Sequence, residues 1–255
     1  MPTSATPLKA LSTHLVEEHP VAIEINQVSY AVMLASPHDL EEFVIGFLLS
    51  NLVISHNRDI HDINISQQDN AYIVNVIIAN RCLVNLQQRQ RQLKGTTGCG
   101  LCGTETLTQA FPTLPTLPAM SAISPNLKTT LSVIRRKLST WQTLAKNSGA
   151  LHAAFWLNTD GQIVACREDI GRHNALDKLI GYLLKNGIDR RQGAILITSR
   201  CSVELVQKSI LAGVPTLISL ASPSQFAVNL AAEHNLLLVQ IPKKISLSIM
   251  VSSNL

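Results

Sequence analysis

The sequence predicts an α/β protein: a carboxyl-terminal part with a mostly parallel, helix-covered sheet, and a smaller α+β part on the amino-terminal side. Three observations lead to this fold class. After residue 151, apolar strand-like segments alternate with helical patterns, an order that produces parallel strands joined by helices. The strands expected after Gly193 are continuous apolar runs, typical of strands covered on both faces. A segment with repeated prolines, residues 111–125, separates the two parts.

The length and composition set the scale of this architecture. With 255 residues, of which 46% are hydrophobic and 15% charged, the chain can bury one large or two small cores. Aromatic residues make up only 4%, so we expect a core of leucine, isoleucine, valine and alanine. We divide the chain into a flexible tail (1–20), an amino-terminal α+β part (21–110), a proline-rich linker (111–125) and an α/β domain (126–255).

The amino-terminal part is expected to combine paired strands with one apolar helix. Two strand-like segments meet at Asn26 and Gln27, which predicts a hairpin turn. Ser36 or Asp39 is expected to cap the helix that follows, whose apolar residues recur at helical spacing. In chain order we expect strands at 21–26 and 29–34, a helix from about residue 40, strands at 61–67 and 71–79, and a polar helix at 81–94.

The carboxyl-terminal part is expected to begin with a long helix and then to alternate between strands and helices. In sheets of this kind, active groups tend to lie at the carboxyl ends of the strands. The expected helices are 126–146, 173–186, 203–212 and 224–234, and the expected strands are 151–157, 162–167, 193–199, 215–220 and 236–241.

The composition disfavours several classes of function. The net charge is +4, and lysine and arginine are scattered along the chain, unlike the basic faces of nucleic-acid-binding proteins. The sequence has no secretory signal and no apolar run that would span a membrane, so we expect neither nucleic-acid nor membrane partners. The five cysteines are odd in number and unevenly spaced, which does not suit a disulfide framework and predicts a reducing, cytoplasmic location.

The sharpest chemical signal is the pair Cys99 and Cys102 within the glycine-rich segment 95–103. Glycine inside a helix or strand costs roughly 1 kcal/mol relative to alanine, so we expect a flexible loop. Three chemistries remain open for the pair: half of a structural zinc site, a thioredoxin-like dithiol, and a mobile carrier of persulfide sulfur. The zinc site lacks a second pair at similar spacing, and no helical pattern starts at Cys99. These observations favour the carrier and no permanently bound metal, but spacing alone leaves the zinc site and the dithiol open.

A second candidate site lies at two predicted strand ends. Asp169, Arg172 and His173 follow one strand and open a helix, and Ser199 and Arg200 occupy the same place after the next strand. Polar groups at such positions suit an anion or a nucleotide. They also suit helix caps and surface ion pairs, so both interpretations stay open on physical grounds. Two such turns on neighbouring strands favour a shared cleft.

Four segments of the chain resemble the formate dehydrogenase accessory sulfurtransferase family, FdhD. They occur in one order and span nearly the whole chain, which makes the combination far more specific than a CxxC pair alone. The segments are SPHDLEEFVIGFLLS (36–50), TGCGLCG (97–103), EDIGRHNALDK (168–178) and SRCSVELVQK (199–208).

The resemblance implies a three-layer fold similar to cytidine deaminases for the α/β domain, a homodimer, and sulfur transfer as the activity. A cysteine desulfurase would donate the sulfur, Cys99 would carry it as a persulfide, and Cys102 would be the second thiol. The acceptor would be the molybdenum cofactor, Mo-bis(molybdopterin guanine dinucleotide), of apo formate dehydrogenase or a related molybdoenzyme. GDP would mimic this cofactor, and the turns at Arg172 and Arg200 would line its cleft.

The resemblance also implies a cofactor-binding stretch after the last predicted strand. The family carries arginine there, often followed by an aromatic residue, whereas this chain has lysines, which lack the planar fork of arginine. A non-catalytic chaperone is the alternative function, since it would keep the nucleotide cleft and make the cysteines dispensable. A zinc deaminase needs an HxE or CxE and a later PCxxC, which the sequence lacks in that order. The cofactor-binding stretch is Ile241, Pro242, Lys243, Lys244, Ile245 and Ser246.

Overall fold

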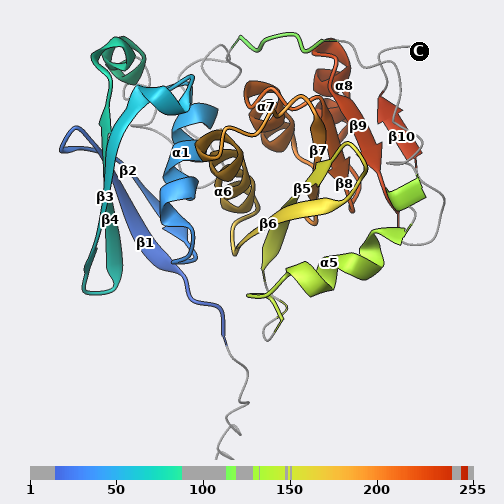
Figure 1. The fold of residues 1–255 in the computed structure, drawn as a ribbon, viewed down its shortest axis with the longest axis horizontal. Helices are drawn as coiled ribbons and strands as arrows, with labels where there is room; N and C mark the ends of the chain where they lie inside the picture. The colour runs from blue at the N-terminus through green and yellow to red at the C-terminus, as the bar shows by residue number, and fades with distance from the viewer. Residues whose placement is uncertain are drawn as a thin grey trace, which may run out of the picture.

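The fold consists of an amino-terminal sheet and a carboxyl-terminal sheet with helices packed between them (Figure 1). The CxxC segment, the tail up to residue 14 and residues 243–247 lie outside the described residues, so the predictions made for them stay predictions. The computed structural model describes residues 15–87, 113–118, 129–131, 133–146, 149, 151–242 and 248–251.

The amino-terminal sheet contains β1 (His19–Ile25), β2 (Val28–Ala35), β3 (Ile60–Gln68) and β4 (Ala71–Ile78), in the order β2-β1-β4-β3. The predicted hairpin is confirmed: Asn26 and Gln27 have φ angles of 50° and 68°, as a tight turn between antiparallel strands requires. β1 and β4 pair in parallel, whereas the pairings of β1 with β2 and of β3 with β4 are antiparallel.

Helix α1 (Leu40–Ser50) packs on this sheet, and most of its side chains are buried. Asp39 stands at the predicted N-cap position, but its side chain does not cap the helix. Asp39 precedes the helix with a φ of 54° and makes no capping hydrogen bond, and its carboxylate lies 3.6 Å from the Arg167 guanidinium. Ser36 is also engaged elsewhere, because its hydroxyl oxygen accepts a hydrogen bond of 3.2 Å from the Ile170 N–H. Both side chains serve tertiary contacts instead of the helix start.

The carboxyl-terminal sheet has the order β10-β9-β8-β7-β5-β6, and the prediction of a mostly parallel sheet is wrong. Parallel pairing occurs between β7 and β8 and between β8 and β9, and the other three pairings are antiparallel. The tight turn between β5 and β6 forces them into an antiparallel hairpin. In the sheet, β5 lies between β6 and β7, and these two neighbours run in the same direction. The bounds are β5 His152–Asn158, β6 Ile163–Asp169, β7 Gly193–Ile197, β8 Thr216–Ser219, β9 Leu237–Gln240 and β10 Ser248–Val251.

Helices cover both faces of this sheet, so the α/β part has the three layers that were expected (Figure 1). On one face lies α5 (Arg135–Trp141), whose Leu138 shares an apolar cluster with Phe155 and Val239 of the sheet. On the other face lie α6 (Arg172–Lys185), α7 (Val203–Leu211) and α8 (Gln225–Glu233). The closer likeness to cytidine deaminases remains a prediction.

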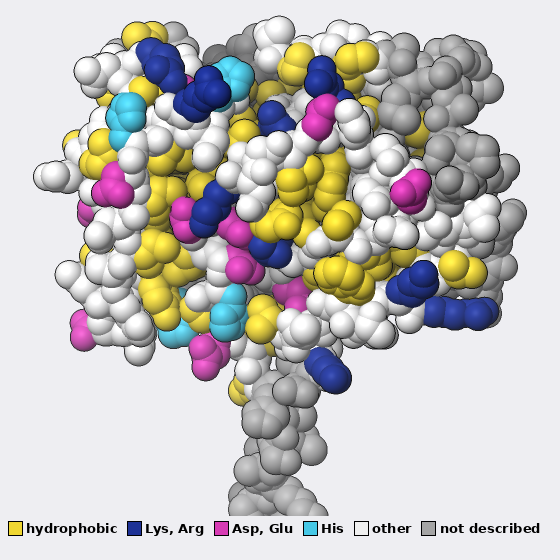
Figure 2. All heavy atoms as spheres, in the orientation of Figure 1, with side chains coloured by type: hydrophobic (Ala, Val, Ile, Leu, Met, Phe, Trp, Pro, Cys, Tyr) yellow, Lys and Arg dark blue, Asp and Glu magenta, His cyan; other side chains and the backbone are white. Residues whose placement is uncertain are grey.

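Helix α1 packs directly against α6, and the two parts of the chain contribute to one hydrophobic cluster. Two glycines permit this close approach. A Cβ on Gly46 would lie 1.9 Å from the Asp177 carbonyl oxygen, and one on Gly181 would lie 1.8 Å from the Glu42 carbonyl oxygen. Acidic and basic side chains gather on the surface near the contact between α1 and α6 (Figure 2). The division of the chain into domains remains a prediction.

Most predicted boundaries agree with the structure to within two residues, but two helices differ. The helix expected at 126–146 ends at Trp141, because Gln142 leaves helical geometry with a ψ of 85°. The helix expected at 81–94 starts as a 3-10 turn, Asn80–Cys82, and its described part continues to residue 87. β10 is not among the predicted strands. No helix in the described ranges is both long and apolar enough to cross a bilayer.

Candidate functional site

The candidate site lies at the sheet edge where β6 and β7 end, beside the first residues of α6 and α7. His152, the first residue of β5, is in register with Asp169, the last residue of β6. Burial lowers the pKa of His152, and the neighbouring Arg172, His173 and Arg200 lower it further. The two turns that the sequence pointed to are therefore close together, around one imidazole.

We define the polar cluster as His152, Arg172, His173, Arg200 and Glu204. His173 Nε2 lies 3.9 Å from Glu204 Oε2, and the two side chains form an ion pair when the imidazole is protonated. The His173 side chain lowers the pKa of Glu204 to about 2, against the opposing effect of burial. Glu204 is therefore ionised at neutral pH, and it holds a negative charge among the three basic residues of the two turns. Glu204 was not among the site residues predicted from the sequence, although it stands in the first turn of the helix after Arg200.

Several buried polar atoms in and beside the polar cluster make no hydrogen bond within the described part of the chain. Buried polar atoms in proteins are usually hydrogen-bonded, so several unbonded ones in one place indicate a site for a ligand or for ordered water. Two of these atoms, His173 Nε2 and Glu204 Oε2, face each other as the ion pair, and Ser202 Oγ lies beside the same carboxylate, whose pKa it lowers. The other two, Arg172 Nε and Gln207 Nε2, are N–H donors without an acceptor among the described residues, which suits the oxygens of a phosphate group.

Asp169 belongs to the scaffold beneath the polar cluster. It forms an ion pair of 2.7 Å with Lys178, and both side chains are 0% exposed. The same carboxylate accepts hydrogen bonds from the backbone N–H groups of Ser36 (3.0 Å) and Gly171 (2.8 Å). Both carboxylate oxygens are thus occupied by protein donors, and these bonds hold the turn at the start of α6.

Lys178 is a residue of this scaffold that the sequence analysis quoted but did not single out. Its ammonium group also donates to the carbonyl oxygens of Ser36 (3.0 Å) and Glu168 (3.3 Å), so its three donors all have acceptors. One signal could have identified it: Lys178 follows Ala175 and precedes Leu179 on the apolar face of a helix, where a lysine requires a buried partner.

Ser199 and Arg200 follow β7 and differ in their surroundings. Ser199 is buried, its hydroxyl donates to the Arg200 carbonyl oxygen (3.2 Å), and its own carbonyl accepts from the Ser219 hydroxyl (3.3 Å). Arg200 is exposed and adds its charge to the polar cluster from the solvent side. Ser199 is thus part of the scaffold, like Asp169.

The predicted cofactor-binding stretch begins at the same edge of the sheet. The parallel register aligns Ile197, Ser219 and Gln240 across β7, β8 and β9. Ile241 follows at 6% exposure; its N–H donates to the Ser219 carbonyl, and its carbonyl accepts from the Arg135 guanidinium. Pro242 is half-buried, and the rest of the stretch, Lys243, Lys244, Ile245 and Ser246, lies outside the described residues.

The three described cysteines have little thiolate character. Burial raises the pKa of Cys166 and of Cys201 to about 12, and it also raises the pKa of Cys82. Because the thiolate is the nucleophile in sulfur chemistry, these three thiols are poor acceptors at neutral pH. Cys99 and Cys102 lie outside the described residues. In the described ranges, no three His, Cys, Asp or Glu side chains are grouped so as to hold a metal ion.

Residues 16–253 match the model of the FdhD/NarQ family. The chain is 39% identical over 230 residues to the sulfur carrier protein FdhD of Bordetella parapertussis, covering 89% of this chain and 82% of that protein. It is 42% identical over 224 residues to the protein of the same name from Cupriavidus necator, covering 88% and 77%. A solved structure from Desulfotalea psychrophila, described as a formate dehydrogenase accessory protein, has the same fold with a TM-score of 0.66 at 24% identity, covering 93% of this chain and 88% of that chain.

Proposed function

Because the chain belongs to the FdhD/NarQ family, we propose that it carries sulfur from a cysteine desulfurase to the molybdenum cofactor of formate dehydrogenase. Cys99 holds the sulfur as a persulfide, and Cys102 is the second thiol. The acceptor is Mo-bis(molybdopterin guanine dinucleotide), which makes the protein a sulfurtransferase. The names of the relatives, which are sulfur carrier proteins, support the first half of this proposal.

In the first transfer, the Cys99 thiolate attacks the outer sulfur of the persulfide on the desulfurase. An S–S bond forms at Cys99 while the S–S bond of the donor breaks, and the donor cysteine leaves as a thiolate. The observation that carries this assignment is the burial and raised pKa of Cys82, Cys166 and Cys201, which disfavour them as acceptors. The glycines around Cys99 suit a segment that must enter two partner sites in turn.

We place the guanine dinucleotide end of the cofactor at the polar cluster. Arg172 and Arg200 offer positive charge to phosphate groups, and the ionised Glu204 offers acceptor oxygens to the N–H groups of a base. Asp169 and Ser199 act indirectly, by holding the two turns. The stretch that starts at Ile241 lies at the same sheet edge and adds Lys243 and Lys244.

We propose two protein partners and one cellular location. The partners are the cysteine desulfurase that donates sulfur and the apo formate dehydrogenase, or a related molybdoenzyme, that receives the cofactor. The protein acts as a homodimer, as the family resemblance implies. A carrier thiol must stay reduced between transfers, which places the protein in the cytoplasm.

The sulfur-carrier step is tested by incubating the protein with a cysteine desulfurase and ³⁵S-labelled cysteine. We expect label on the peptide that contains Cys99 and Cys102, and we expect a reductant to release it. The matched control is Cys166→Ala, which should keep full labelling because Cys166 is a half-buried thiol with a pKa of about 12. Absence of label from the Cys99 peptide would sink the carrier proposal.

A second variant, Cys99→Ala, separates a carrier from a cofactor-binding chaperone. Cys99→Ala should abolish maturation of formate dehydrogenase activity if sulfur must pass through Cys99. Full activity with Cys99→Ala would favour the chaperone.

The nucleotide site is tested by calorimetry with GDP. Arg172→Gln should weaken GDP binding, and Arg136→Gln, which changes an exposed residue on α5, should not.

A further inference from the structure

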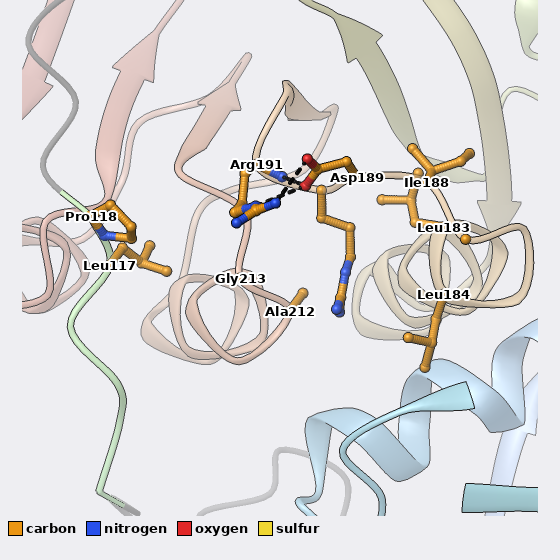
Figure 3. A pocket seen from close by; sticks show the side chains of 11 residues that line it. Leu117, Pro118, Leu183, Leu184, Ile188, Asp189, Arg191, Ala212 and Gly213 are labelled. Atoms are coloured by element: carbon orange, nitrogen blue, oxygen red, sulfur yellow. Dashed lines mark hydrogen bonds and ion pairs between the residues drawn. The ribbon is translucent and has the colours of Figure 1, made fainter. Parts of the chain in front are cut away.

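A cavity of about 440 Å³ lies at the opposite end of α6 and α7 from the polar cluster (Figure 3). Leu183 and Leu184, near the end of α6, lie on one side of it, and Leu117 and Pro118 lie on the other. The loop 187–191 lines it between the two helices, and the cavity is partly open to solvent. Small-molecule sites typically have volumes of about 300–1,000 Å³ and mostly apolar walls. The volume of this cavity falls in that range, and its lining is mainly apolar.

Arg190 lines the cavity and has no partner for its charge. The nearest acid in sequence, Asp189, is bound by the Arg191 guanidinium at 2.9 and 3.1 Å and by the Gln192 amide at 3.2 Å. Arg190 itself makes no hydrogen bond and no ion pair with any residue that the structure describes. Burial lowers the pKa of its guanidinium, and the charge of Asp189 opposes this effect. The Arg190 side chain is half-buried, and its five N–H donors have no protein acceptor in the part of the chain that the structure describes.

The C-terminal ends of α6 and α7 explain why a positive charge is stable at Arg190, but they do not bind the N–H donors of its guanidinium. Gly187 and Gly213, which follow the last turns of α6 and α7, line the same cavity. Helix C-termini carry partial negative charge, which stabilises a nearby cation. They make no hydrogen bond to Arg190 among the described residues, so its planar fork remains free to pair with two oxygen atoms of a ligand.

We propose that this cavity binds a small organic anion with an apolar body, whose carboxylate, sulfonate or phosphate group pairs with Arg190. The fork of the guanidinium matches two oxygens of such a group. The leucine and proline walls would remove the apolar body of the ligand from water. The cavity lies at the other end of α6 and α7 from the polar cluster, so this site is separate from the proposed nucleotide site.

The probe for this site is 8-anilinonaphthalene-1-sulfonate, an aromatic anion whose fluorescence rises in apolar surroundings. N-phenyl-1-naphthylamine has the same rings without the sulfonate and serves as the neutral control. We expect one molecule of the anion to bind per full-length chain, more tightly than the neutral compound. Equal affinity for the two compounds would show a merely apolar surface and would overturn the proposal.

Variants then locate the charge that the probe recognises. Arg190→Met should weaken binding of the anionic probe at least about tenfold and leave the neutral compound unchanged, since a charge-assisted bidentate pair is lost. Arg136→Met removes the same charge from the far side of the sheet and should change neither compound. Circular dichroism checks folding, and if Arg190→Met does not fold, Arg190→Lys should give an intermediate affinity. Unchanged binding of the anion by a folded Arg190 variant would refute the site.

Discussion

Replacing Lys178 with methionine tests whether the buried ion pair beneath the polar cluster holds the fold together. The change removes the ammonium group, keeps the length of the side chain, and leaves the Asp169 carboxylate buried without its charged partner. Removing one partner of a buried ion pair costs about 3–5 kcal/mol. The matched control is Lys185→Met on the same helix. Lys185 pairs with Glu41 at the same 2.7 Å, but these side chains are 41% and 43% exposed. The expected loss there is below about 1 kcal/mol.

The assay is urea and thermal unfolding of the two variants and the unmodified protein, followed by circular dichroism. For a chain of this size, a loss of 1 kcal/mol lowers the melting temperature by about 2–4 °C. We therefore expect a fall of roughly 6–20 °C for Lys178→Met and of less than about 4 °C for Lys185→Met. Equal losses in the two variants would refute the reasoning, because the Lys178 pair is buried and its ammonium group also has two carbonyl acceptors, whereas the Lys185 pair is exposed.

Three further predictions concern the site and its support. Glu204 has a folded-state pKa of about 2 against an ordinary 4.5, so its ionised form stabilises the fold above about pH 4.5, and this contribution is lost as the pH falls toward 2. Glu204→Gln should therefore lower the free energy of unfolding in urea at pH 6 more than at pH 3; the same loss at both would contradict this. Gly181→Ala drives a Cβ to 1.8 Å from the Glu42 carbonyl oxygen and should cost about 1–3 kcal/mol in the same assay; an unchanged urea midpoint would contradict the close packing. Cys166 and Cys201, with a pKa of about 12, should resist labelling by a thiol reagent at pH 8 in the folded protein, as mapped by mass spectrometry; rapid labelling of either would count against their inert character.

The periodicity of apolar residues predicted the helices and strands well, because it is a local property of the chain. The apolar runs after Gly193 and the helical spacing after Arg172 gave bounds that agree closely with β7, β8, β9 and α6. The order of the strands within the sheet was harder to predict. The sequence order β6-α6-β7 correctly implies two strands that run in one direction, but it does not indicate that β5 lies between them.

The capping residues of α1 show the same limit at the level of single side chains. Ser36 and Asp39 have the composition of a helix start, and local preference alone would assign them to it. In the structure Ser36 is bonded to Asp169 and Ile170, and Asp39 lies beside Arg167, all more than a hundred residues away. Contacts at that distance along the chain depend on how α1 packs against the helical layer.

The sequence alone determined most of the secondary-structure elements, the placing of Arg172, His173 and Arg200 at strand ends, and the resemblance to a family of sulfur carriers. Only the tertiary structure decided what each polar residue does. It buries Asp169 against Lys178, brings Glu204 to His173, and leaves Arg190 without a partner in a cavity. The physical reason is that propensity and periodicity act between neighbours in sequence, whereas burial and the pairing of charges depend on which elements pack together.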